Sequence, residues 1–143
     1  MLELSSSDFD AADTAEMDVV INGRASGWKW TFAGPGHPLT IAQGNRVSRE
    51  RLHRERQIEQ ARANNKKWKA EDEDVDEVRE RNINWVVERL VGWPTIKFDG
   101  ELLEFSQDAA RKLLSDPRKV DLFVQAMEFL AADNSFTRRS ATN

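Results

Sequence analysis

The side chains that most often bind metals or carry out catalysis are few in this chain, and their spacing suits neither task. There are two histidines, no cysteine and no tyrosine among 143 residues. His37 lies between glycine and proline residues and His53 lies in an arginine-rich stretch, so neither has a second ligand at the spacing of a helical zinc site. Without cysteine, disulfides and thiolate chemistry are excluded. We therefore predict no metal site and no cofactor.

Sequence motifs for nucleophiles and phosphate loops are also missing. No serine lies in a Gly-x-Ser-x-Gly turn, and no Gly-x-x-x-x-Gly-Lys loop is present. The run at 34–38, GPGHP, contains two prolines, which lack the N–H donors that a phosphate loop requires. The carboxylates gather at 71–77, EDEDVDE, which is typical of a solvated acidic face rather than a tuned acid/base pair. We predict that the protein is not an enzyme and has no catalytic residues.

Three aromatic residues are more informative. Trp28, Trp30 and Phe32 occupy alternate positions, which in an extended strand places them on one face. Either helices of this chain cover that stripe, with the last helix as the candidate, or another protein does, since open strand edges invite strand addition. The pattern leaves both options open and makes the three aromatics candidate partner-binding residues.

The elements around this stripe predict an α+β fold that is mostly α-helical. Apolar alternation before and after Asn22-Gly23 predicts an N-terminal β-hairpin within 17–38. A highly charged stretch at 39–69 predicts one long polar helix. Apolar residues at helical spacing, together with capping residues, predict a compact C-terminal group of three helices at 75–91, 107–114 and 116–132. Asp99-Gly100 predicts a tight turn between the first two of these helices.

The chain length fits one domain, which we place at 17–136. Residues 1–16 are acidic and lack a regular apolar period, so we expect a flexible acidic tail there, and another flexible tail at 137–143. No apolar run approaches the roughly 20 residues of a membrane span, and the N-terminus does not resemble a signal peptide. We expect a soluble cytoplasmic protein with no membrane partner.

Charge is strongly segregated in the middle of the chain. Residues 46–69 hold nine Arg or Lys and three Glu, a net charge of +6, whereas residues 71–80 hold seven acids and one Arg, a net charge of −6. The two segments could neutralise each other across an antiparallel pair of helices, or dock on a partner's complementary surface. A nucleic-acid arm is the third and least favoured interpretation, because the adjacent acids repel phosphate and no aromatic lies between the arginines.

Two stretches together resemble the tail assembly chaperones of long-tailed phages and prophages. One is the hairpin at 18–38, DVVINGRASGWKWTFAGPGHP, and the other is the block at 87–117, VERLVGWPTIKFDGELLEFSQDAARKLLSDP. The resemblance covers roughly residues 17–136, with Phe136 near its end. These are mainly packing and turn residues, so they carry the pattern of the family rather than its contacts.

The resemblance implies a non-enzymatic function. Family members bind the long helical tape measure protein in the host cytoplasm, recruit tail tube subunits around it and leave before the virion is complete. The candidate contact residues are Trp28, Trp30 and Phe32 with Arg49, Arg54 and Arg56, and self-association is a further option. The alternatives are a DNA-associated regulatory protein that uses the basic helix at 46–69, and a structural component retained in the particle.

Overall fold

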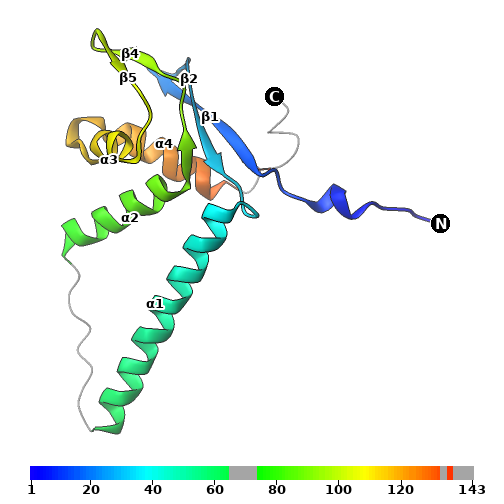
Figure 1. Cartoon of the computed structure of the whole chain (residues 1–143), viewed down its shortest axis with the longest axis vertical. Helices are drawn as coiled ribbons and strands as arrows, with labels where there is room; N and C mark the ends of the chain where they lie inside the picture. Colours follow the sequence, from blue (N-terminus) through cyan, green and yellow to red (C-terminus); the bar gives the residue numbers. More distant parts are fainter. Residues whose placement is uncertain (65–73, 133–134, 137–143) are drawn as a thin grey trace.

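The computed structural model describes residues 1–64, 74–132 and 135–136, and it confirms an α+β fold that is mostly helical (Figure 1). The helical elements are η1 (Ser6–Phe9), α1 (Pro38–Ala63), α2 (Val75–Arg89), α3 (Gln107–Ser115), η2 (Pro117–Lys119) and α4 (Val120–Ala131). The strands are β1 (Thr14–Ile21), β2 (Arg24–Ala33), β3 (Leu90–Gly92), β4 (Ile96–Phe98) and β5 (Glu101–Leu103).

The N-terminal hairpin is confirmed, and it begins earlier than expected. β1 and β2 pair antiparallel around Asn22 and Gly23, whose φ angles of 52° and 78° are those of a type I′ turn. Because β1 starts at Thr14, three residues assigned to the acidic tail belong to the sheet.

A short third strand corrects the predicted end of the helix at 75–91. α2 ends at Arg89, and Leu90 to Gly92 form β3, which pairs antiparallel with β2 at Phe32–Leu90 and Thr31–Gly92. The sheet order is therefore β1-β2-β3, and β2 is its central strand. The helical spacing of apolar residues extends through Leu90. The last residues of a helix leave backbone groups without partners, and pairing with the edge of β2 that faces away from β1 satisfies such groups in β3.

The remaining predicted elements are found close to their expected positions. β4 and β5 form a hairpin whose turn residues, Asp99 and Gly100, have φ angles of 52° and 80°. Ser106 caps α3 by accepting a hydrogen bond from the backbone N–H of Ala109, 2.9 Å away. The long polar helix is found as α1 (Pro38–Ala63), and residues 65–69 of its predicted range lie outside the described residues.

The hydrophobic core lies between one face of the β1-β2-β3 sheet and the three C-terminal helices. Its fully buried side chains include Trp30, Phe32, Val86, Val87 and Leu114. In Figure 1, α2, α3 and α4 gather beside the sheet, whereas α1 leaves the end of β2 and projects away from them. The molecule thus consists of a compact body and one extended helix.

Candidate interaction surface

The aromatic stripe of β2 is covered by this chain itself. Trp30 and Phe32 have 0% of their surface exposed and Trp28 has 8%. The stripe therefore faces the core, and the assignment of these three residues as an accessible contact surface is corrected. The expectation of an open strand edge fails at this end of β2, because β3 pairs along it.

Trp93, which follows β3, is at the centre of the aromatic cluster. Its ring centroid lies 5.4 Å from that of Trp28 and 5.2 Å from that of Trp30, and Phe105 packs against it in a T-shaped arrangement at 4.9 Å. At the far end of the stripe, Phe129 of α4 lies 5.6 Å from Phe32. The last helix thus covers part of the aromatic stripe, which was one of the two options that the sequence left open.

The free edge of β1 is closed at one point by a side chain. The carboxamide of Gln125 on α4 accepts a hydrogen bond from the backbone N–H of Val20 at 2.8 Å and donates one to its carbonyl oxygen at 2.9 Å. This pair of bonds imitates the contact that a neighbouring strand would make. It reduces the tendency of the β1 edge to add a strand from another chain.

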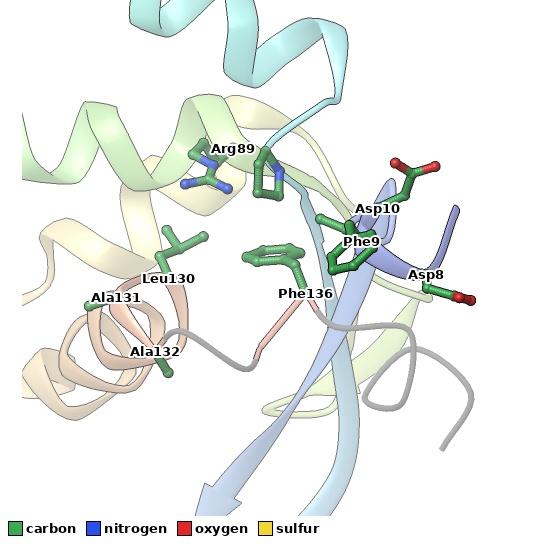
Figure 2. Close-up of a pocket in the computed structure, with 10 residues that line it drawn as sticks. Asp8, Phe9, Asp10, Arg89, Leu130, Ala131, Ala132 and Phe136 are labelled. Atoms are coloured by element: carbon green, nitrogen blue, oxygen red, sulfur yellow. The ribbon is translucent and has the colours of Figure 1, made fainter. Parts of the chain in front are cut away.

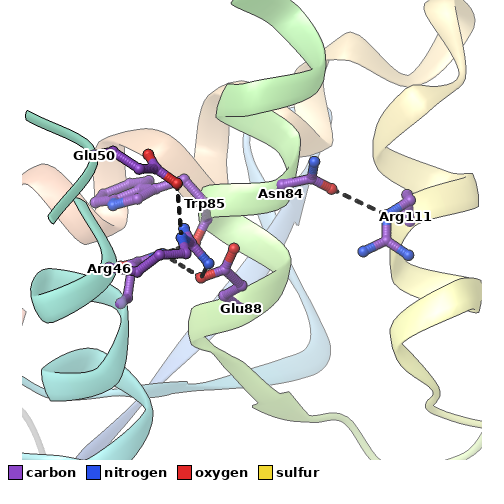
Figure 3. Close-up of polar contacts among 7 residues, drawn as sticks. Arg46, Glu50, Asn84, Trp85, Glu88 and Arg111 are labelled. Carbon is purple, nitrogen blue, oxygen red and sulfur yellow. Dashed lines mark hydrogen bonds and ion pairs between the residues drawn. The ribbon is translucent and has the colours of Figure 1, made fainter. Parts of the chain in front are cut away.

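α1 is attached to the body through its first three turns. Gln43, the buried residue of this helix, donates a hydrogen bond to the carbonyl oxygen of Trp85 at 3.0 Å. Arg46 forms an ion pair with Glu88 at 2.7 Å, and Figure 3 shows its guanidinium between Glu88 and Glu50. The hydrogen bond to Glu88 is the main cause that raises the pKa of Arg46. On the other side of α2, Asn84 accepts a hydrogen bond from Arg111 of α3 at 3.1 Å (Figure 3).

On the side of α1 opposite this attachment, exposed apolar and basic side chains form a strip. At 100° per residue, a sector of about 80° on the side of the helix opposite Gln43 contains Asn45 and Glu59 together with four apolar or basic side chains. We call these four the α1 outer strip: Ile41, Arg49, Leu52 and Arg56. Ile41 and Leu52 are each 52% exposed, and both arginines are exposed.

The three arginines predicted as contact residues do not all share this strip. Arg49 and Arg56 flank Leu52, three residues before it and four after it. Arg54 lies on the side of the helix that carries Gln43, and it has an interaction partner. Ile41 and Leu52 were not singled out from the sequence, although their spacing with Arg49 and Arg56 provides the signal.

The charge segregation is found only in part within the described residues. α1 holds six arginines and three glutamates, a net charge of +3. Arg46 of α1 forms an ion pair with Glu88, near the end of α2. Four acids of the acidic segment are described, Asp74, Asp76, Glu77 and Glu80, and its other three acids, at 71–73, lie outside the described residues.

Both histidines have local hydrogen bonds. His37 caps α1 by accepting a hydrogen bond from the backbone N–H of Leu39 at 3.1 Å, and His53 lies 3.1 Å from the side-chain amide of Gln57. In the described part of the chain, no group of three or more His, Cys, Asp or Glu residues has a geometry that could hold a metal ion.

None of the helices within residues 1–64 and 74–132 combines the length and the apolar composition that a membrane span requires. The α1 outer strip is an extended exposed surface beside a body with a buried core. Comparison of the chain with protein-family models, with curated proteins and with solved structures finds no match.

Proposed function

We propose that the chain is a non-enzymatic binding protein that acts as a phage tail assembly chaperone. Its partner in this proposal is the tape measure protein, around which it helps to recruit tail tube subunits in the host cytoplasm, and it leaves before the virion is complete. Two things support the proposal: the resemblance of residues 18–38 and 87–117 to that family, and the α1 outer strip.

The α1 outer strip is the observation that carries the proposal. α1 has 26 residues and is therefore about 39 Å long, yet Gln43 is its buried residue. A helix that is polar on most sides gains little stability from its own chain, and partner contacts commonly supply the rest. A long helical partner with an exposed apolar face would pack against Ile41 and Leu52.

Charge decides how such a contact would be oriented. Arg49 and Arg56 flank Leu52, so acidic residues beside the partner's apolar face would pair with them. Contacts of this kind raise the association rate and fix the register more than they raise the affinity. An interface of one helix face also buries a modest area, which suits a protein that has to be released.

Copurification tests the proposal directly. The full chain is coexpressed with a fragment of the tape measure protein, as wild type and as the double variant Arg49→Glu, Arg56→Glu. We expect the variant to retain less than a tenth of the partner, because the charge pairs become repulsive. The matched control is Lys112→Glu, Arg118→Glu, which makes the same charge change at exposed positions of α3 and η2. Equal retention by both double variants would refute the role of the outer strip.

The fate of the protein distinguishes an assembly factor from a component of the particle. We expect mass spectrometry of purified virions to find the tape measure and tail tube proteins without this chain. Its presence there in stoichiometric amounts would instead identify a retained structural component.

The exposed arginines of α1 support a DNA-associated regulator as the second candidate. Contacts to DNA phosphates weaken steeply as the salt concentration rises, so a gel-shift assay at about 50 mM salt is a sensitive way to detect DNA binding. On the chaperone proposal we expect no shifted band, since three glutamates lie among the six arginines. A band at low salt that disappears in Arg49→Glu, Arg56→Glu would favour the regulator.

A further inference from the structure

Arg89, the last residue of α2, is buried with its hydrogen-bonding capacity only partly used. The residue is 8% exposed, and its Nη2 donates to the carbonyl oxygen of Ala33 at 2.6 Å. Its Nε is buried and has no hydrogen-bond acceptor among the described residues. No ion pair joins Arg89 to a carboxylate among the residues that the structure describes. Burial lowers the pKa of the guanidinium, because removing a cation from water disfavours its charged form.

The guanidinium borders a pocket that is built from distant parts of the chain. The pocket has a volume of about 420 Å³, and its lining comes from the N-terminal segment, the end of α4 and Phe136. In Figure 2 the guanidinium points toward the space between Leu130 and Phe136. The Phe136 ring centroid lies 5.3 Å from the guanidinium carbon, and the Trp85 ring centroid lies 5.8 Å from it.

Hydrogen bonds hold the wall of this pocket in place. The carbonyl oxygen of Phe136 accepts a bond from the backbone N–H of Ala12 at 2.7 Å. Ser135 next to it donates from its hydroxyl to the carbonyl oxygen of Phe129 at 2.6 Å. The ring of Phe136 also packs edge-on against Phe129 at 5.6 Å. The position of the aromatic wall beside Arg89 is therefore fixed by contacts to both the N-terminal segment and α4.

The chemistry of the lining restricts what the pocket can bind. A buried guanidinium is costly without an anion, and its planar fork suits the two oxygens of a carboxylate. Phe9, Leu130 and Phe136 provide apolar walls. Asp8 and Asp10 also line the pocket, and their negative charges disfavour the binding of a dianion such as phosphate more than that of a single carboxylate.

We propose that this pocket binds one carboxylate of a partner polypeptide together with the apolar side chain next to it. The carboxylate pairs with Arg89, and the apolar side chain lies against Leu130 and Phe136. It comes either from the partner's C-terminus or from an acidic side chain. The lining of this pocket contains no residue of the α1 outer strip, so a test of the pocket is independent of the function proposed above.

Nuclear magnetic resonance on the intact ¹⁵N-labelled chain tests the site with small probes. N-acetyl-leucine carries a carboxylate beside an apolar side chain, and N-acetyl-leucinamide is its uncharged match. We expect N-acetyl-leucine to shift the Nε–Hε resonance of Arg89 with saturation in the millimolar range, and the amide and inorganic phosphate to leave it unchanged. Equal shifts from the acid and the amide, or no shift from the acid at 20 mM, would overturn the proposal.

Two peptides then distinguish the sources of the carboxylate. One ends in a free leucine carboxylate and has no acidic residue, and the other has an internal Glu-Leu pair and an amidated C-terminus. Preferential binding of the first assigns the site to a C-terminus, and preferential binding of the second assigns it to an acidic side chain. Failure of both peptides to bind would contradict the proposal.

Two variants link the binding to this pocket. We expect Arg89→Gln to abolish binding of N-acetyl-leucine, provided that its circular dichroism stays native. Asp10 is exposed, so Asp10→Asn tests the site without disturbing the core, and we expect it to tighten binding about twofold to fivefold. Glu101→Gln makes the same charge change on exposed β5, away from the residues that line the pocket, and serves as control. The same affinity for both acid-to-amide variants would count against the pocket.

Discussion

The body of the protein and its long helix differ in how much of their side-chain surface is buried. The body buries a continuous cluster that includes five aromatic side chains: Trp28, Trp30, Phe32, Trp93 and Phe136. α1 is the longest element, yet it contributes the polar residue Gln43 as its buried side chain. Stability is therefore concentrated in the body, and exposed side chains with no role in packing are concentrated on α1.

This contrast shows which surface the fold leaves uncovered. The strongest apolar pattern in the sequence, the stripe on β2, marks the core, because aromatic burial is the largest stabilising contribution available to a small sheet. The weakest pattern, on α1, marks the surface that the chain leaves uncovered. Substitutions in the two regions should consequently differ in what they change: the stability of the fold or the binding of a partner.

The largest effect is expected in the aromatic cluster of the core. Trp30→Ala removes a side chain with no exposed surface and leaves a cavity between Phe32 and Trp93, so we expect a loss of about 3–5 kcal/mol in the free energy of unfolding. Denaturant titration followed by tryptophan fluorescence measures it. A loss of less than about 1 kcal/mol would mean that the stripe is not packed as described.

Two glycines, one beside the body and one inside α1, allow the same comparison between the body and the long helix. A Cβ at Gly34, between β2 and α1, would collide with the backbone oxygen of Ala12, so we expect Gly34→Ala to cost about 1–3 kcal/mol. Gly44 lies inside α1 with nothing near its added Cβ, and Gly44→Ala should stabilise that helix by about 0.5–1 kcal/mol.

Global unfolding measures the first glycine variant, and hydrogen exchange of α1 amides measures the second. We expect Gly34→Ala to destabilise the fold and Gly44→Ala to stabilise α1. A destabilising effect of Gly44→Ala on the exchange of α1 amides would mean that this helix is packed more closely than its exposure indicates.

Most of the fold could be predicted from local patterns. The turn at Asn22-Gly23, the turn at Asp99-Gly100 and the cap at Ser106 each depend on the chemistry of a few neighbouring residues, and all three are found in the structure. β3 was missed because three residues carry too little periodicity to identify a strand. Its partner, Phe32, is about sixty residues away, so the pairing is a tertiary effect.

The candidate surface was predicted less well for the same physical reason. Alternation placed Trp28, Trp30 and Phe32 on one face, but no local pattern says whether that face meets the chain's own helices. The pocket beside Arg89 depends on contacts among the N-terminal segment, α2 and α4, which are far apart in the sequence. By contrast, the spacing of Arg49, Leu52 and Arg56 is a local signal that helical geometry alone could have revealed.

A smaller effect is expected where the two regions meet. A double-mutant cycle with Arg46→Ala and Glu88→Ala should give a coupling of about 0.2–1 kcal/mol, because both side chains keep part of their exposure to solvent. Urea titrations of the four proteins measure the coupling, and it should shrink in 1 M salt. A coupling above about 2 kcal/mol would show that α1 is held to the body far more firmly than this exposed ion pair allows.

The smallest effect on stability is expected on the α1 outer strip, and there the comparison is tested most directly. Leu52→Ala removes a side chain that is 52% exposed, so the free energy of unfolding should change by less than about 0.5 kcal/mol. The same truncation at buried Leu114 should cost about 2–5 kcal/mol. If α1 binds a helical partner, Leu52→Ala should nevertheless weaken copurification with the tape measure fragment, because Leu52 lies between the two arginines at the centre of the strip. Unchanged copurification at unchanged stability would leave Leu52 without a role, and the outer strip would then be an ordinary solvated helix face.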